Sequence, residues 1–221
     1  RAMRGRQGSA VIVDAVRTPG GKRNGKLKDW HPADLAAHVL NALQQRNDLD
    51  PASVDDVIMG CVMQVGQQSL NIGRNAVLAA GWPESVPATT VDRQCGSSQQ
   101  ALHFAAQGVI AGAYDIVIAA GVEVMTRTPM GSSVVKELGF PFPKSMFDRY
   151  EATGLPPQGI GAEMIADEYG FTREDLDAFG AESQRRAAQA TAEGRFDNEI
   201  VPVPVESDGA AELMTRDEGI R

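Results

Sequence analysis

Two hydrophobic patterns alternate along the N-terminal part of the chain. Short runs of β-branched or continuous apolar residues predict buried strands, and apolar residues that recur every three or four positions predict amphipathic helices. The expected strands are Ser9–Val16, Val54–Val62, Ala88–Val91 and Tyr114–Gly121. The expected helices are Pro32–Gln45, Asn71–Ala80 and a helix that follows Cys95 and ends at Gly112.

This alternation predicts the fold class. Strands separated by helices pair in parallel, because the crossover connection returns the chain to the same end of the sheet. The run Tyr114–Gly121 is almost continuously apolar, as expected for a strand that is covered on both faces. We therefore expect an α/β protein with a doubly wound, mostly parallel sheet, and we expect its chemistry at the carboxyl ends of the strands.

The pattern changes after Met125. The segment Thr128–Pro157 is rich in proline and glycine and has no clear period, so we interpret it as an excursion over the core. Helical spacing returns in Gly161–Tyr169 and Arg173–Glu193. The segment Glu199–Val205 resembles a strand, but its two prolines confine it to a sheet edge.

Charge and composition exclude several function classes. The net charge of −8 lacks the basic surface that nucleic-acid binding requires. No apolar run is long enough to cross a membrane, and the first seven residues lack the apolar core of a secretory signal. The two cysteines are too far apart in sequence for a disulfide framework or a metal-binding motif. We therefore expect a cytoplasmic protein with no metal, no nucleic-acid partner and no membrane segment.

Cys95 is the main candidate for chemistry. The stretch Ala88–Gln100 begins as a β-branched run, breaks at Asp92–Gln94 and continues with helical spacing. Cys95 therefore lies at the start of a helix, where backbone N–H groups have no partner within the helix. The positive end of the helix dipole favours a thiolate there, as a nucleophile requires. The local sequence is equally compatible with a small buried residue at a corner.

A cysteine nucleophile usually works with a base, and none is evident in this chain. His103 lies eight residues after Cys95, so it is about 12 Å further along the helix and cannot reach the thiol. His31 precedes a proline in a loop and His38 lies within the first helix. Both are better explained as surface or packing residues.

The remaining candidates favour structural roles. The segment Gly20–Leu27 approaches the phosphate-binding motif G-x-x-x-x-G-K-[ST], but Leu27 replaces the hydroxyl residue and no helix follows at once. A solvated basic loop, able to attract an anionic substrate, fits better. We interpret Cys61 as a core residue and Glu123 as a carboxylate that fixes a loop by accepting backbone N–H groups. No G-x-S-x-G motif surrounds Ser97, which disfavours a serine hydrolase.

Taken together, the chain resembles the thiolases, acyl-CoA C-acyltransferases that cleave or form 3-ketoacyl-CoA. The motifs occur in the expected order and cover nearly the whole chain. They are Val13–Pro19, Asn71–Arg74, Arg93–Ser97, Ala120–Met125, Arg185–Asp197, Glu199–Pro202 and Asp217–Arg221.

The resemblance implies roles for three residues. Cys95 would carry the acyl group as a thioester before CoA or an acyl-CoA carbanion accepts it, and its backbone N–H is a candidate donor to the developing oxyanion. Arg221 matches an arginine that contacts the CoA nucleotide, and Gln158 occupies a position that faces the acyl pocket. CoA and acyl-CoA would be substrates, with no permanently bound cofactor. The segment Thr128–Pro157 is closer to degradative or steroid-side-chain members than to the biosynthetic type.

The resemblance also implies an incomplete protein. Thiolases are longer, and their activating histidine, in a Gly-His-Pro motif, and their second catalytic cysteine lie in a C-terminal half that is absent here. We expect a four-stranded core in residues 1–123, an incomplete inserted loop domain in residues 124–221 and the fifth core strand beyond Arg221. We expect this chain to be inactive alone. Thiolases pair through the strand that corresponds to Ala88–Val91, so a homodimer is expected, with a tetramer left open.

Three positions depart from the family pattern, and two alternative functions stay open. Gln158 stands before Gly159 where the family has methionine. Ser98 stands where glycine is common, and Asp92 stands where asparagine is frequent. One alternative is a ketoacyl-synthase relative, which shares the fold and the helix-end cysteine but needs two histidines further along its chain. The other is a non-catalytic module for dimerisation or CoA binding. Preferential labelling of Cys95 over Cys61 by a thiol reagent separates a reactive site from an inert module.

Overall fold

The computed structural model describes residues 8–207 and 209–221. The prediction that the first seven residues are not a secretory signal concerns residues outside the described part. The chain forms two compact units, which we describe separately. The sheet unit contains the described residues up to Ser133 together with Asp197–Gly219, and the helical unit contains Val134–Phe196 and Ile220–Arg221.

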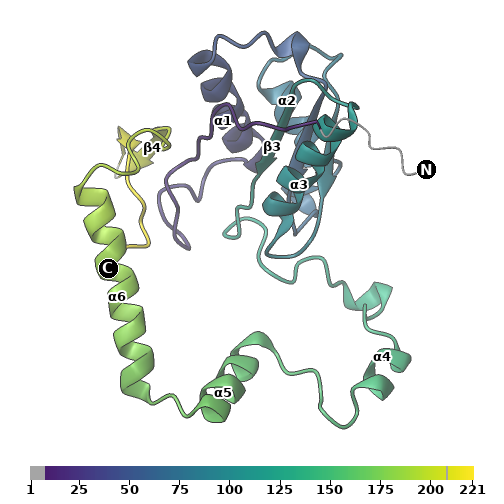
Figure 1. The fold of residues 1–221 in the computed structure, drawn as a ribbon, viewed down its shortest axis with the longest axis vertical. Coiled ribbons are helices and arrows are strands. Elements are labelled where there is room, and N and C mark those ends of the chain that lie inside the picture. Colours follow the sequence, from purple (N-terminus) through teal and green to yellow (C-terminus); the bar gives the residue numbers. More distant parts are fainter. Residues whose placement is uncertain (1–7, 208) are drawn as a thin grey trace. The chain divides into compact units, whose positions relative to one another are not determined.

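The sheet unit is built on a parallel three-stranded sheet. Its strands are β1 (Asp56–Gly60), β2 (Ala88–Val91) and β3 (Val117–Gly121), in the order β2-β1-β3. Figure 1 shows the ribbon of this sheet, with β3 labelled. The last residue of β1 pairs with the last residue of each neighbour, so all three carboxyl ends lie at one edge. The predicted parallel sheet is confirmed.

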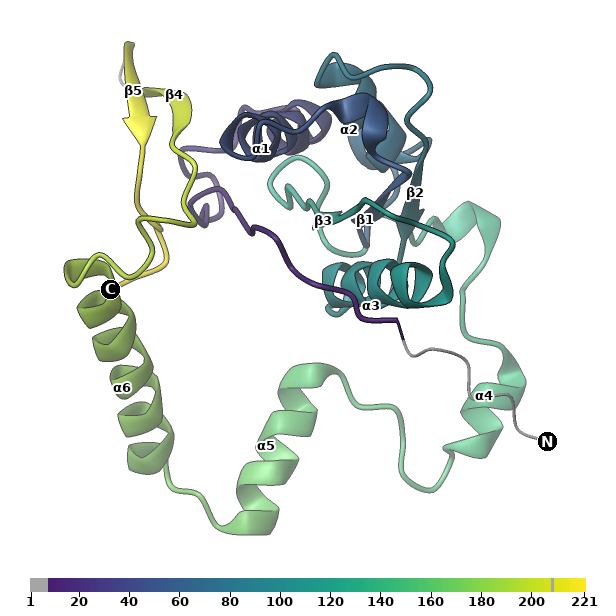
Figure 2. The ribbon, with the colours of Figure 1, turned by 45° about the horizontal axis from the view of Figure 1, so that its top comes forward.

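Helices cover both faces of this sheet, as Figure 2 shows. They are α1 (Pro32–Arg46), α2 (Ile72–Ala79) and α3 (Ser97–Ala111). Alternate residues of β1 explain the two layers, because side chains of a strand point to opposite faces in turn. Val57 and Met59 join the apolar cluster that includes α1 and α2, whereas Ile58 packs with Ala101 and Ala105 of α3. The sheet is therefore doubly wound.

The predicted first strand, Ser9–Val16, is wrong. This segment forms no strand, and Val11, Ile12 and Val13 are largely exposed to solvent. A cavity of about 1090 Å³ is lined by this segment, by α1 and by β3, which is an edge strand among the described residues. A strand requires a hydrogen-bonding neighbour as well as apolar residues, and the segment has none here. The sheet accordingly has three strands and not the four expected.

A short antiparallel hairpin completes the sheet unit. Its strands are β4 (Val203–Ser207) and β5 (Ala210–Met214). Pro204 lies within β4, which has a single partner strand, in line with the expected edge position. The second strand was not predicted, because most of its residues are exposed and polar or small. Two 3-10 turns, η1 (Pro51–Ser53) and η2 (Gly66–Gln68), flank β1.

The helical unit contains η3 (Lys136–Leu138), α4 (Lys144–Arg149), α5 (Gln158–Tyr169) and α6 (Arg173–Ala192). The last two confirm the helical spacing, and α4 and η3 lie in the segment for which no period was evident. Thr172 and Asp175 form a reciprocal capping box that fixes the start of α6. No helix in the described ranges is long and apolar enough to cross a membrane.

Candidate active site

Cys95 lies in the turn that joins β2 to α3, and its side chain is exposed to solvent. Gly96 is the N-cap of α3 and supplies no side-chain cap. The first turn of α3 also carries no acidic residue. Cys95 therefore stands beside backbone N–H groups at the positive end of a 15-residue helix, in the local setting that the sequence predicted.

The turn before Cys95 has an unusual backbone. Gln94 adopts a positive φ of 47°, a conformation that residues other than glycine rarely adopt. The N–H of Gln94 donates to Oδ1 of Asp92 at 2.6 Å. Asp92, one of the three departures from the family pattern, thus supplies a side-chain oxygen that stabilises the turn. The hydroxyl of Ser97 adds two further hydrogen bonds to the same turn.

Two glycines set the position of α3 on the sheet. Gly60 and Gly121 are paired in register at the ends of β1 and β3. A Cβ atom at Gly60 would collide with the backbone of Ser97 and Ser98, and one at Gly121 would collide with the Ser98 side chain. The start of α3 therefore rests directly on the carboxyl edge of the sheet, which only glycine permits at this distance.

Cys61, the other thiol, follows β1 at the same edge and is only 1% exposed. Burial and the neighbouring Glu123 carboxylate raise the pKa of Cys61 to about 12. A thiol with such a pKa stays protonated at neutral pH and is a poor nucleophile. The interpretation of Cys61 as a core residue fits its burial.

Glu123 follows β3 and organises the chain around Cys61. Its carboxylate accepts hydrogen bonds from the N–H groups of Val62 at 2.8 Å and Met63 at 3.3 Å. It also accepts one from Nε2 of Gln68 at 2.6 Å. Gln68, which is fully buried, in turn accepts the N–H of Val124 at 2.8 Å. The loop-fixing role inferred for Glu123 agrees with these bonds.

Sequence reasoning missed Gln68. Its amide links η2 to the segments that follow β1 and β3, with Nε2 donating to the carbonyl of Met63 at 2.9 Å. The only signal in the sequence was a polar residue of unassigned role in a glycine- and glutamine-rich turn. A buried amide that satisfies several neighbours is recognisable only once those neighbours are placed.

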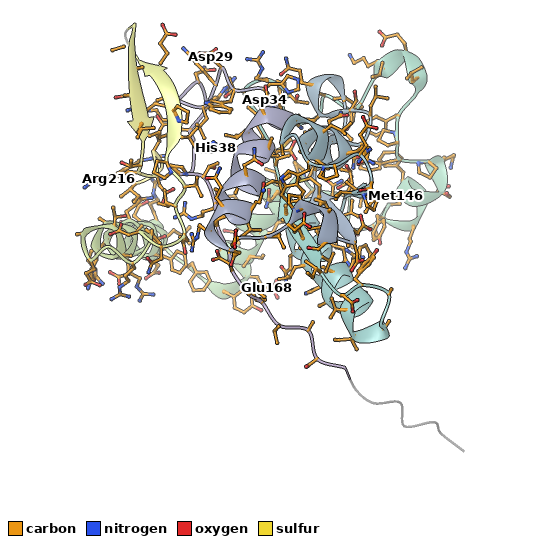
Figure 3. The ribbon with its side chains drawn as sticks, turned by 90° about the horizontal axis from the view of Figure 1, so that it is seen from above. Asp29, Asp34, His38, Met146, Glu168 and Arg216 are labelled. Atoms are coloured by element: carbon orange, nitrogen blue, oxygen red, sulfur yellow. The ribbon has the colours of Figure 1, made fainter. Side chains whose placement is uncertain are left out.

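None of the three histidines is positioned as a base for Cys95. His31 caps α1 by accepting the N–H of Ala33, and His103 lies on α3 with its side chain exposed. His38 projects from α1 toward the β4–β5 hairpin, where Nε2 lies 2.9 Å from the carbonyl oxygen of Pro202 (Figure 3).

The basic loop after Pro19 is held by acidic residues. Glu218 accepts the N–H groups of Lys22 and Lys26, and Nζ of Lys26 pairs with Glu212 at 2.6 Å. Asp217 accepts the N–H of Gly20 at 2.6 Å. Backbone N–H groups that would cradle a phosphate are thus already bonded to carboxylates, which argues against a nucleotide site.

Gln158, expected to face the acyl pocket, and Arg221, expected to contact the CoA nucleotide, both belong to the helical unit. Gln158 is the first residue of α5. The backbone N–H of Arg221 donates to Oε1 of Gln184 on α6 at 2.8 Å. Cys95 belongs to the sheet unit. Among the described residues, no three metal-ligating side chains gather into a candidate metal centre.

Comparisons with known proteins identify the family. The thiolase N-terminal domain profile matches residues 10–221. A steroid 3-ketoacyl-CoA thiolase of Mycobacterium tuberculosis is 45% identical over 204 residues, which cover 90% of this chain and 50% of that protein. A 3-ketoacyl-CoA thiolase of Aliivibrio fischeri is 43% identical over 216 residues, covering 96% of this chain and 54% of that protein.

A solved structure agrees with this assignment. The crystal structure of the Bacillus anthracis acetyl-CoA acetyltransferase matches with a TM-score of 0.82 at 32% identity, over 97% of this chain and 56% of that chain. This match confirms the thiolase-like α/β fold. The chain spans about half the length of the curated relatives it matches. It belongs to the thiolase family and corresponds to the family's N-terminal domain.

Proposed function

We propose that this chain is the N-terminal part of an acyl-CoA C-acyltransferase in which Cys95 carries the acyl group. The observation that carries the proposal is an exposed thiol at the start of α3, in a chain of the thiolase family. The exposed position leaves this sulfur open to a substrate, and the helix start places backbone N–H groups beside it. The substrates are acyl-CoA and CoA, and no permanently bound cofactor is required.

In the degradative direction, the Cys95 thiolate attacks the 3-keto carbonyl of a 3-ketoacyl-CoA. A C–S bond forms, the bond between C2 and C3 breaks, and its electron pair leaves on C2 of acetyl-CoA, which takes up a proton. The thiolate of CoA then attacks the acyl-Cys95 thioester and releases the shortened acyl-CoA with a free Cys95. Each attack places negative charge on a carbonyl oxygen, and the Cys95 N–H is a donor to it.

The reaction needs groups other than Cys95. We infer that the second half of the full-length protein supplies the base and the second catalytic cysteine, and that residues 124–221 belong to the inserted loop domain. Arg221 would contact the CoA nucleotide and Gln158 the acyl chain. A homodimer through Ala88–Val91 would pair β2, an edge strand in the described part, and so remove an aggregation-prone edge. The protein would act in the cytoplasm.

Acyl-enzyme mapping tests the proposal. The full-length protein is incubated with acetyl-CoA, quenched in acid and digested, and the acetylated peptide is identified by mass spectrometry. We expect the label on the peptide that contains Cys95, and its loss in Cys95→Ser but not in Cys61→Ala. Acetylation elsewhere, or none, would refute the role of Cys95. Measurable thiolysis by the 221-residue chain alone would refute the inference that the second half is required.

A further inference from the structure

Ser97 is the buried polar residue in the first turn of α3, with only 4% of its surface exposed. Its Oγ donates to the carbonyl oxygen of Gln94 at 2.6 Å and accepts the N–H of Arg93 at 3.0 Å. The hydroxyl therefore uses both its donor and an acceptor on the backbone that immediately precedes Cys95. Ser97 has no role in the acyl-transfer steps proposed for Cys95.

These two bonds act on a strained residue. The φ of 47° at Gln94 lies in the left-handed region, which is disfavoured about tenfold for a residue with a side chain. The carbonyl group that Ser97 binds belongs to the peptide bond between Gln94 and Cys95. The orientation of that peptide sets the direction of the Cys95 N–H and of its Cα–Cβ bond. Any relaxation of Gln94 would therefore reorient both groups that the reaction uses.

Ser97 can hold this conformation because the start of α3 is packed closely on the sheet. Gly60 and Gly121 allow the helix backbone to rest on the ends of β1 and β3, so closely that a Cβ atom at either position would collide with Ser98. Ala101 of α3 is fully buried against Ile58 of β1. The hydroxyl is thus fixed relative to the sheet, and the turn has to conform to it.

We propose that Ser97 is a positioning residue, whose hydroxyl keeps Gln94 in the left-handed conformation and thereby aims the thiol and N–H of Cys95 at the substrate. This inference rests on the proposed role of Cys95. It assigns to Ser97 no contact with substrate and no transfer of a proton. The Ser97 hydroxyl instead raises the fraction of molecules in which the thiol and N–H of Cys95 point toward the substrate.

Ser97→Ala in the full-length protein is the first test. We expect the second-order rate of Cys95 alkylation by iodoacetamide to fall at least about fivefold and acetylation by acetyl-CoA about tenfold or more, since misorientation weakens a positioned attack. Ser53→Ala is the matched control. It removes a hydroxyl bond of the same kind, from Ser53 to the carbonyl of Asp50 at 2.6 Å, before β1 at the opposite edge of the sheet.

The double variant Gln94→Gly with Ser97→Ala separates positioning from packing. Glycine adopts a positive φ without penalty, so the turn no longer needs the hydroxyl. We expect the double variant to recover at least half of the lost acetylation rate. If Ser97 merely fills space beneath α3, the glycine leaves the loss unchanged.

A second variant covers the case in which Ser97→Ala unfolds the protein, which rapid labelling of the buried Cys61 would reveal. Gln94→Val keeps Ser97 and alters an exposed side chain, but its branched Cβ disfavours positive φ. We expect the same fall in Cys95 reactivity with Cys61 still protected. Unchanged Cys95 alkylation in Ser97→Ala or in Gln94→Val overturns the proposal. Absence of acetylation in the wild type instead refutes the proposed function, while alkylation still decides the role of Ser97.

Discussion

Cys61 and Cys95 follow two neighbouring parallel strands at the same edge of one sheet. Their side chains nevertheless differ in exposure to solvent and in the groups that surround the sulfur. Cys61 is enclosed, and its pKa is raised to about 12 by burial and by the Glu123 carboxylate. Cys95 is exposed at the start of α3. The carboxyl edge of a parallel sheet therefore does not by itself make a cysteine reactive. The segment that follows each strand determines the surroundings of its cysteine.

The two segments satisfy their backbone donors differently, although a carboxylate takes part in both, because Asp92 accepts the N–H of Gln94 in the turn before Cys95. After β1, the N–H groups of Val62 and Met63 are bonded by the Glu123 carboxylate, which brings a negative charge beside Cys61. After β2, the chain enters a helix whose N-cap, Gly96, supplies no side-chain acceptor. Burial and the Glu123 carboxylate therefore suppress ionisation of Cys61, whereas Cys95 is exposed at the start of a helix.

The largest expected effect is a difference in alkylation rate between the two thiols. At pH 8 in the full-length protein, we expect iodoacetamide to label Cys95 at least about 100-fold faster than Cys61, because the thiolate is the nucleophile and Cys61 is both protonated and enclosed. Mass spectrometry of timed digests measures both rates in one sample. In urea the two rates should converge. Equal labelling rates in the native protein would contradict the inference that Cys95 is more reactive than Cys61.

Gly60→Ala should lower the reactivity of Cys95 and so reduce the difference between the two thiols. The new Cβ would collide with the backbone of Ser97 and Ser98, so the start of α3 must move away from the sheet. We expect a loss of about 1–3 kcal/mol in the free energy of unfolding. Cys95 labelling should fall severalfold. Urea titration and timed labelling measure the two effects.

Gly180→Ala is the control for that variant. Gly180 lies within α6, and a Cβ there would meet no atom within 4 Å. Alanine is favoured over glycine inside a helix by about 0.5–1 kcal/mol, so this substitution should stabilise its helix and leave Cys95 labelling unchanged. A similar loss of Cys95 reactivity in both variants would show that the effect of Gly60→Ala is not local.

Glu123→Gln should raise the reactivity of Cys61 and so make the two thiols more alike. An amide keeps one acceptor oxygen but turns an NH₂ group toward the donors of Met63 and Gln68, which leaves a buried donor unsatisfied. We expect a loss of about 1–2 kcal/mol in the free energy of unfolding and, because a charge that raises the pKa of Cys61 is removed, faster Cys61 labelling at pH 9. Glu206→Gln, at an exposed position in β4, is the control and should change neither quantity.

The sequence predicted those parts of this contrast that depend on neighbours along the chain. The helix start at Cys95 follows from the break at Asp92–Gln94 and the apolar spacing beyond it, and the loop-fixing role of Glu123 follows from its place after a strand. Features that depend on distant segments were missed or wrong. Gln68 binds segments far along the chain, and Ser9–Val16 has the pattern of a strand without a neighbour to pair with.

The turn at Gln94 shows the same division. A positive φ at a glutamine has no signature in composition or periodicity. Asp92 bonds to this turn from two residues away, whereas Ser97 bonds to it from the start of α3, which is seated on the sheet. The glycines that permit this seating, Gly60 and Gly121, are visible in the sequence as strand ends. Their shared register is not, because it depends on which strands pair.

The smallest effect concerns stability at alkaline pH. Folded Cys61 keeps its proton up to a pKa of about 12, whereas the unfolded chain releases it near the ordinary value of 9.0. The unfolded state therefore binds fewer protons between these values, so stability falls as pH rises from 9 toward 12 and is unaffected by this group below pH 9. At pH 10 only the first part of this loss has developed. Urea midpoints at pH 8 and pH 10 measure it.

Cys61→Ala isolates the contribution of this thiol from the other groups that titrate in the same range. The variant loses some stability at every pH, because a buried side chain is shortened, but it should lose less than the wild type between pH 8 and pH 10. Cys95→Ala provides the reverse control: an exposed thiol contributes no comparable burial, so its pH dependence should follow the wild type. If the two alanine variants show the same alkaline loss, the protonated state of Cys61 is not linked to folding, and its low reactivity must come from enclosure alone.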